Sequence, residues 1–285
     1  MNFKLYFLLD RTKSIMPKEF IDMALTNSDF SFTVIDDNDV LLKYNDRNII
    51  FEASIYLKAK SIIPNIHLLN AQYKNINMHL EIPLIYPEYK INLFLDKINL
   101  LVKNFNLVCY NEMFDDVIQF KKDDIIYAYQ QTKHTYMEKE KEEFMSFYHV
   151  DKMRLNDYLT YENEYDHACK YYSNKGITVP KILYYIDEIT GSVNAAVEWN
   201  GLTNLLIPPF VDYIYYRCDN DSKVILTKEF NTQLKKYMDN IQSFMPGTKV
   251  ISEKKIVKCQ KALKKAKFTL ILKKFKVVSQ TQLID

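Results

Sequence analysis

The sequence predicts an α+β protein made of an N-terminal ferredoxin-like α/β sandwich, a helical middle segment, and a C-terminal, mostly antiparallel sheet with helices. Two observations carry this prediction. Residues 76–110 change from strand-like to helical and back to strand-like apolar spacing, which is typical of a βαβ unit. After residue 180, short apolar segments are separated by the turn-forming residues Gly, Pro and Asn. We therefore expect parts at 1–111, 112–175 and 176–285.

The first part contains the clearest local patterns. The apolar run 3–9 predicts a buried strand, and Pro17 marks the start of a helix, because its fixed φ suits the first helical turn. A wide apolar face from Ile91 to Phe105 predicts a second helix, and residues 107–110 return to a strand. Period-two alternation predicts the remaining strands, at 30–34, 40–44, 49–57 and 76–82.

The middle segment, 112–175, contains neither Gly nor Pro and includes the charge run 137–144. We expect two or three helices there, with a break near His149. We also expect this segment to bridge two domains.

The C-terminal part should be a sheet with two hairpin turns. Thr190-Gly191 and Asn200-Gly201 are both hairpin signals, and Asn-Gly is the stronger of the two. Helical spacing predicts helices at 230–241 and 252–266. The expected strands lie at 181–186, 193–199, 204–207, 211–217, 224–226 and 268–278.

Glycine usage argues against several classes of enzyme. The chain has four glycines, and none lies in the first 175 residues. Phosphate-binding loops, dinucleotide fingerprints and nucleophile elbows need closely spaced glycines, so we exclude them. His167 and Cys169 lack the further ligands of a zinc site. Glu198 and Asp212 are a conceivable carboxylate pair, but outward polar positions on alternating strands are far commoner than such a site. We predict no metal, no cofactor and no catalysis, and keep an enzyme assembled from dispersed residues as a third alternative.

The charge distribution suggests an anionic partner. The net charge is +2, yet residues 249–276 hold eleven lysines and one glutamate, giving +10. On the helix expected there, one face carries Lys254, Lys258, Lys261 and Lys265. Such a face can bind nucleic-acid phosphates, and this binding would be sensitive to salt. Because the segment has no arginine, we expect contacts with the phosphate backbone and no bidentate contacts. The alternative is a solvated helix surface.

Aromatic residues suggest a protein partner. Trp199, Tyr213 and Tyr215 lie on the expected C-terminal strands, and Trp and Tyr are enriched at protein interfaces. The tyrosines could instead be ordinary strand residues. We expect a non-catalytic interaction protein or complex subunit, with a nucleic-acid-associated protein as the alternative. Four widely spaced cysteines favour the cytoplasm, and no apolar run is long enough to span a membrane. Oligomeric state is not encoded in any recognisable pattern.

Overall fold

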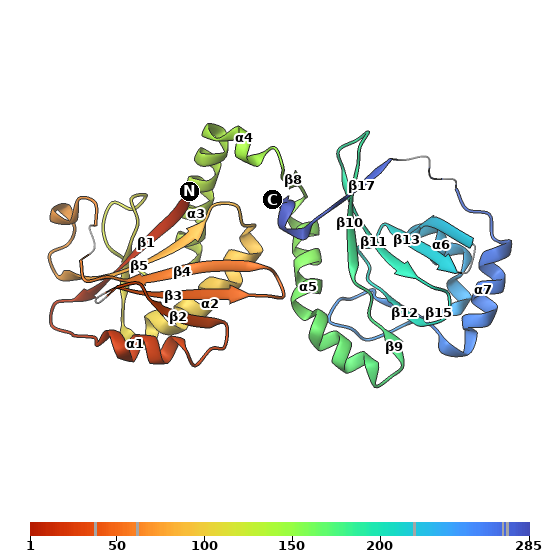
Figure 1. Cartoon of the computed structure of the whole chain (residues 1–285), viewed down its shortest axis with the longest axis horizontal. Helices are drawn as coiled ribbons and strands as arrows, with labels where there is room; N and C mark the ends of the chain where they lie inside the picture. Colours follow the sequence, from red (N-terminus) through yellow and green to blue (C-terminus); the bar gives the residue numbers. More distant parts are fainter. Residues whose placement is uncertain (37–38, 61–62, 219–220, 270, 272–273) are drawn as a thin grey trace. The chain divides into compact units, whose positions relative to one another are not determined.

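The computed structural model describes residues 1–285 except 37–38, 61–62, 219–220, 270 and 272–273 (Figure 1). The chain divides into two compact units, Met1–Met145 and Ser146–Asp285. Both units mix helices and strands, so the predicted α+β class is confirmed.

The described residues of the first unit form one antiparallel sheet in the order β2-β3-β4-β5-β1-β6-β7. Its strands are β1 (Asn2–Asp10), β2 (Phe30–Val34), β3 (Val40–Asp46), β4 (Phe51–Leu57), β5 (Tyr73–Pro83), β6 (Val108–Tyr110) and β7 (Ile118–Gln119). Its helices are α1 (Pro17–Ala24), α2 (Glu88–Phe105), α3 (Lys122–Lys139) and α4 (Lys141–Phe144), with a 3₁₀ turn at Ile66–Leu68.

The four central strands have the ferredoxin-like arrangement. β1 lies between β5 and β6, which are joined through α2, and β4 pairs with the other edge of β5. This split βαβ topology is the one expected from the sequence. β2 and β3 extend the sheet beyond β4, and β7 extends it beyond β6.

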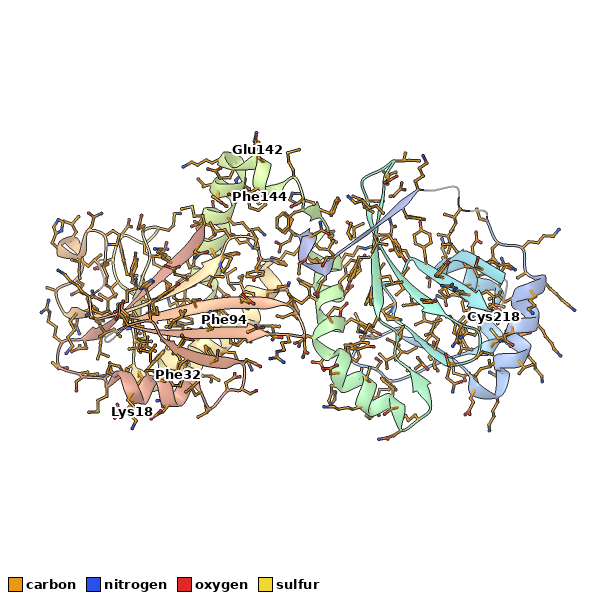
Figure 2. All side chains as sticks on the ribbon, in the orientation of Figure 1. Lys18, Phe32, Phe94, Glu142, Phe144 and Cys218 are labelled. Carbon is orange, nitrogen blue, oxygen red and sulfur yellow. The ribbon has the colours of Figure 1, made fainter. Side chains whose placement is uncertain are left out.

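Alternation along β1 assigns the two faces of this sheet. Phe3, Leu5, Phe7 and Leu9 belong to the main core with the apolar residues of α1, α2 and α3, whereas Tyr6 and Leu8 belong to a smaller cluster on the other face. Phe94 of α2, labelled in Figure 2, packs with ring centroids 4.8 Å from Tyr44 and 5.3 Å from Phe51. The helices therefore cover one face of the sheet.

The second unit contains three sheets among its described residues: β14-β13-β11-β10-β17, β15-β16-β12-β9 and β18-β8. The strands are β8 (Tyr148–His149), β9 (Ile177–Thr178), β10 (Ile182–Asp187), β11 (Val193–Trp199), β12 (Asn204–Ile207), β13 (Tyr213–Cys218), β14 (Asp221–Leu226), β15 (Met238–Asn240), β16 (Lys249–Ile251), β17 (Phe275–Val278) and β18 (Leu283–Ile284). The helices are α5 (Lys152–Ser173), α6 (Thr227–Gln233) and α7 (Ile256–Lys265), with 3₁₀ turns at Lys235–Tyr237, Glu253–Lys255 and Gln280–Gln282.

Of the two expected hairpins, one is confirmed and one is wrong. β10 and β11 pair antiparallel around Thr190-Gly191. The chain after Asn200-Gly201 instead leaves the sheet, since β12 pairs with β9 and β16 and β11 pairs in parallel with β13. Gly201 has a φ of +77°, so it makes a sharp turn between two sheets.

Two further expectations need correction. The helix expected at 230–241 ends at Gln233, because Met238–Asn240 pairs with β16 and this pairing overrides the local helical spacing. The strand expected at 268–278 is limited to Phe275–Val278 within the described residues, and 270 and 272–273 lie outside them. The helical middle segment exists, with α3 and α4 in the first unit and α5 in the second.

Throughout the described ranges, no helix combines the length and the apolar character needed to cross a bilayer.

Candidate interaction surface

The five-stranded sheet of the second unit has one face that packs against helices, which we call the inner face. Tyr184, Trp199 and Tyr216 lie on it and are almost completely buried. The ring of Tyr184 lies 5.1 Å from that of Tyr158 in α5, and the ring of Trp199 lies 5.9 Å from that of Phe230 in α6. The inner face is therefore the core of this part of the unit.

The opposite face, which we call the outer face, is defined by the register of the strands. Tyr213 pairs with Ala196, Tyr215 pairs with both Glu198 and Val224, and Tyr185 pairs with Val277. Directly paired residues point to the same side of a sheet, so these side chains share one surface. Val277 is 65% exposed and Val224 is 37% exposed. The outer face thus presents apolar side chains to solvent.

A shallow groove of about 140 Å³ runs across the outer face. Ala196 contributes a small, buried side chain to its lining, among larger neighbours. The ring of Phe275 lies 5.3 Å from Tyr213 and 6.0 Å from Tyr185, so these rings support one another as walls. The groove is lined by Tyr185, Ala196, Tyr213, Tyr215, Val224 and Phe275.

Two ionisable side chains of the outer face, Tyr185 and Glu198, influence one another. Burial, and secondly the carboxylate of Glu198, raise the pKa of Tyr185 above its ordinary value of 10. Glu198 itself is exposed beside Tyr215, its directly paired residue. The side chains that line the groove are uncharged, and the carboxylate of Glu198 lies beside one of them, Tyr215.

The three aromatic residues singled out from the sequence do not lie on one surface. Trp199 is 1% exposed, and its indole Nε1 donates a hydrogen bond to the carbonyl of Thr203 at 2.9 Å. Tyr213 is buried in the outer face, and Tyr215 is partly exposed there. Trp199 pairs with Tyr216, which places it on the inner face, opposite Tyr213 and Tyr215.

The outer face also contains Tyr185, Val224, Phe275 and Val277, none of which was predicted from the sequence as a site residue. Tyr184 and Tyr185 are adjacent, so sequence alone does not say which one faces solvent. Phe275 and Val277 alternate with lysines in a short edge strand. That alternation was the available signal, but it becomes informative only once β17 is known to pair with β10.

The lysine-rich helix is a second candidate surface. Lys254, Lys258, Lys261 and Lys265 are all exposed, whereas Cys259 and Leu263 of the same helix are buried. Within the described residues none of these four lysines forms an ion pair, unlike Lys255, whose Nζ lies 3.2 Å from Oδ1 of Asp239. Lys258, Lys261 and Lys265 lie at helical spacing on α7, and Lys254 lies in the 3₁₀ turn before it, and we call these four exposed residues the lysine strip.

Glu198 and Asp212 serve different purposes. Asp212 forms an ion pair with Arg154 of α5, and its carboxylate also accepts a hydrogen bond from the backbone N–H of Ala195 at 2.8 Å. These contacts tie α5 to the start of β13. Asp212 thus has a structural role, whereas Glu198 lies on the outer face. In the part of the chain that the structure describes, no three His, Cys, Asp or Glu side chains converge as metal ligands would.

Comparison with models of protein families, with curated proteins and with solved structures finds no match to this chain.

Proposed function

We propose that this chain is a non-catalytic interaction protein that binds another protein through the outer face of its five-stranded sheet. The observation that carries the proposal is the aromatic groove between the exposed Val224 and Val277. The helices α5 and α6 pack on the other side of this sheet. Exposed apolar patches of this kind mark interfaces, and Tyr-rich pockets accept the anchor residues of partners.

The chemistry of the groove defines the partner. A cavity of the order of 150 Å³ holds one benzene-sized group, so the groove suits a single apolar anchor side chain. Glu198, beside Tyr215, favours a Lys or Arg next to that anchor, since a cation there meets both a carboxylate and tyrosine rings. We therefore propose a protein partner whose docking segment carries a large apolar residue beside a basic one.

Site-specific photo-crosslinking tests this proposal. A photoreactive amino acid is placed at Val277 on the outer face and, as a matched control, at Val257 of α7, which is 63% exposed. We expect a discrete protein adduct from position 277 that position 257 does not give. The identified partner, purified, should bind the Val277→Glu variant at least ~10-fold more weakly than the natural chain, because a carboxylate would replace an apolar contact. Equal adducts at both positions, or unchanged affinity, would refute the proposal.

Nucleic-acid association is a second candidate, favoured by the strip of four exposed lysines. Each phosphate contact with a single strand adds about 0.7 to the slope of log affinity against log salt. Replacing Lys254, Lys258, Lys261 and Lys265 with Gln should therefore flatten that slope by about two to three units for a single-stranded RNA oligonucleotide. A flat salt dependence in the natural chain would exclude this function.

We also propose a cytoplasmic location. Cys109 and Cys259 are buried, and burial raises the pKa of each thiol to about 12, which keeps both protonated and unreactive. Chains with isolated thiols of this kind are typical of reducing compartments.

A further inference from the structure

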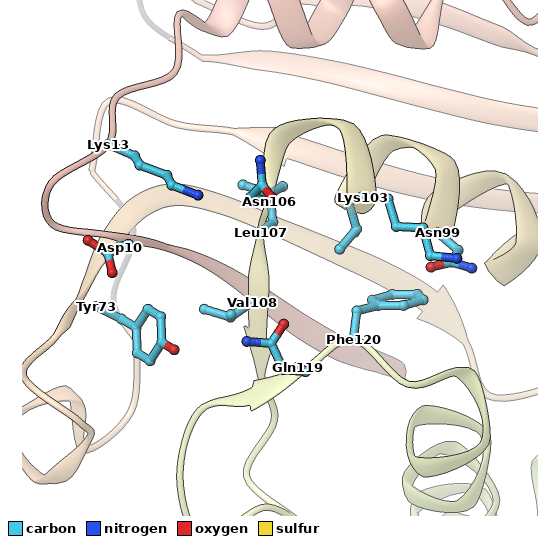
Figure 3. A pocket seen from close by; sticks show the side chains of 11 residues that line it. Asp10, Lys13, Tyr73, Asn99, Lys103, Asn106, Leu107, Val108, Gln119 and Phe120 are labelled. Atoms are coloured by element: carbon cyan, nitrogen blue, oxygen red, sulfur yellow. The ribbon is translucent and has the colours of Figure 1, made fainter.

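A cavity of about 380 Å³ lies in the first unit, beside the end of helix α2 (Figure 3). The split βαβ topology creates it, because the chain leaves α2, forms β6 and then β7, next to the loop after β1. Val102, Leu107 and Val108 supply apolar atoms, and Phe120 and Tyr73 contribute aromatic rings. This volume is within the range of pockets that bind small molecules.

Two lysines on separate elements border this cavity. Lys13 belongs to the loop after β1, and Lys103 belongs to the last turn of α2. Figure 3 shows the Lys13 side chain extending toward Asn106. Neither lysine forms an ion pair with another described residue, and both are exposed to solvent. Their positive charges therefore remain available to a bound anion.

The acidic residue of the cavity, Asp10, is already engaged. One of its carboxylate oxygens accepts hydrogen bonds from the backbone N–H and the hydroxyl of Thr12, at 2.8 and 2.6 Å, and the other accepts from Gln72 at 2.9 Å. These bonds, led by that from the Thr12 hydroxyl, lower the pKa of Asp10 to about 2. Asp10 is thus a fixed part of the wall, and the cavity lining carries a net charge of about +1 from two lysines and one aspartate.

Three side-chain amides line the cavity together with the lysines. Asn99, Asn106 and Gln119 line the cavity, and their amides make no hydrogen bond to other residues in the described ranges. Asn106 adopts a left-handed conformation with φ +52° and ends α2. Each amide offers both a donor and an acceptor, which suits hydroxyl groups.

We propose that this cavity binds a small anionic metabolite that carries a phosphate or carboxylate group on a hydroxyl-rich body. Lys13 and Lys103 attract the negative charge of the ligand from separate elements, the three amides bind the hydroxyls, and Phe120 packs against the carbon skeleton. This site lies in the first unit and is independent of the outer face of the five-stranded sheet, so either proposal can fail without the other.

Calorimetric titration of the full chain tests the site with three probes: ribose 5-phosphate, citrate and uncharged ribose. We expect ribose 5-phosphate or citrate to bind with a dissociation constant below about 1 mM, and ribose to bind at least ~10-fold more weakly. Binding of the first identifies a phosphate ligand, and binding of the second alone identifies a carboxylate ligand.

Two double variants, each of which removes two positive charges, complete the test. Lys13→Gln with Lys103→Gln should weaken binding at least ~10-fold. Lys139→Gln with Lys141→Gln, at exposed positions of the same unit, should leave the affinity unchanged. Absence of binding by both anions would overturn the proposal. Equal loss in the two double variants would also overturn it, because the attraction would then be non-specific.

Discussion

Trp199 and Tyr215 lie on neighbouring strands but on opposite faces of one sheet. Trp199 is enclosed by Tyr216 and Phe230, with its N–H bonded to Thr203. Tyr215 lines the groove of the outer face. A buried indole with its hydrogen bond satisfied contributes to stability, whereas a partly exposed tyrosine is free to contact another molecule.

Fluorescence of the single tryptophan reports directly on this assignment. We expect a blue-shifted emission maximum in the native state and weak quenching by acrylamide, because Trp199 is 1% exposed. Its replacement by Ala should lower the free energy of unfolding by about 3–5 kcal/mol in urea titrations. Strong quenching of the native protein would show that the indole is accessible and that the assigned faces are reversed.

Glu81 is expected to make folding depend on pH. Burial by itself would raise the pKa of Glu81. Hydrogen bonds from His79, Asn2 and Lys4 outweigh that effect and lower the pKa from 4.5 to about 2, and the bond from His79 contributes most. Because the folded-state pKa is the lower one, its stabilising effect is complete above pH 4.5 and is lost as the pH falls toward 2.

The variant Glu81→Gln should therefore be less stable at pH 7 by about 1 kcal/mol and should lose part of the pH dependence below pH 4.5. Urea unfolding at pH 7, 4.5 and 3 measures both effects. Glu52, an exposed carboxylate on β4, provides the control, and Glu52→Gln should behave like the natural chain. An unchanged pH profile in Glu81→Gln would contradict the prediction.

At the scale of elements, the turn at Gly201 connects β11 to a strand of another sheet. A Cβ added to Gly201 would lie 2.9 Å from both the side-chain Nε2 of Gln260 and the ring of Tyr216. Gly191 also has a positive φ, +70°, but a Cβ there would meet nothing within 4 Å. A substitution at either glycine would thus strain the backbone, but only at Gly201 would the new side chain also meet close neighbours.

The variants Gly201→Ala and Gly191→Ala should separate these two effects. Backbone strain alone should cost about 1–2 kcal/mol at Gly191, and the clash should add to that cost at Gly201. Thermal unfolding measures the difference. Equal destabilisation would show that the surroundings of Gly201 adapt to a side chain.

Some elements of the fold could be predicted from the sequence and others could not, for physical reasons. The βαβ unit around α2 was predictable, because local periodicity and burial agree from Ile91 to Phe105. The partner of β11 was not, because the Asn-Gly signal at Gly201 specifies a turn but not the sheet that the next strand joins. Met238–Asn240 became a strand through pairing with β16, which no local pattern reveals.

The same limit applies to the candidate surface. Tyr213 and Tyr215 were identified from the sequence and line the groove, but Phe275 reaches it from a strand about 60 residues further along the chain. Alternation says which residues share a face of one strand. Strand order decides which strands share the face, and it depends on tertiary pairing.

At the scale of the whole molecule, the chain consists of two units that each have a buried core. We expect fragments 1–145 and 146–285 to fold when expressed separately, since a compact unit of this size can bury enough apolar surface. Circular dichroism during heating should show a cooperative transition for each fragment. A fragment that remains unfolded would show that its core depends on the other unit.

We propose that the inner face of the five-stranded sheet supports folding and that the outer face binds a protein partner. Tyr215 and Tyr216 are adjacent in β13 and lie on opposite faces, so they form a matched pair.

The decisive measurement compares Tyr215→Ala with Tyr216→Ala, recording unfolding in urea and affinity for the partner captured at position 277. Tyr216→Ala should lose about 3–5 kcal/mol of stability. Tyr215→Ala should stay within about 1 kcal/mol of the natural stability and weaken partner binding at least ~10-fold. Full partner affinity in a folded Tyr215→Ala variant would contradict the claim.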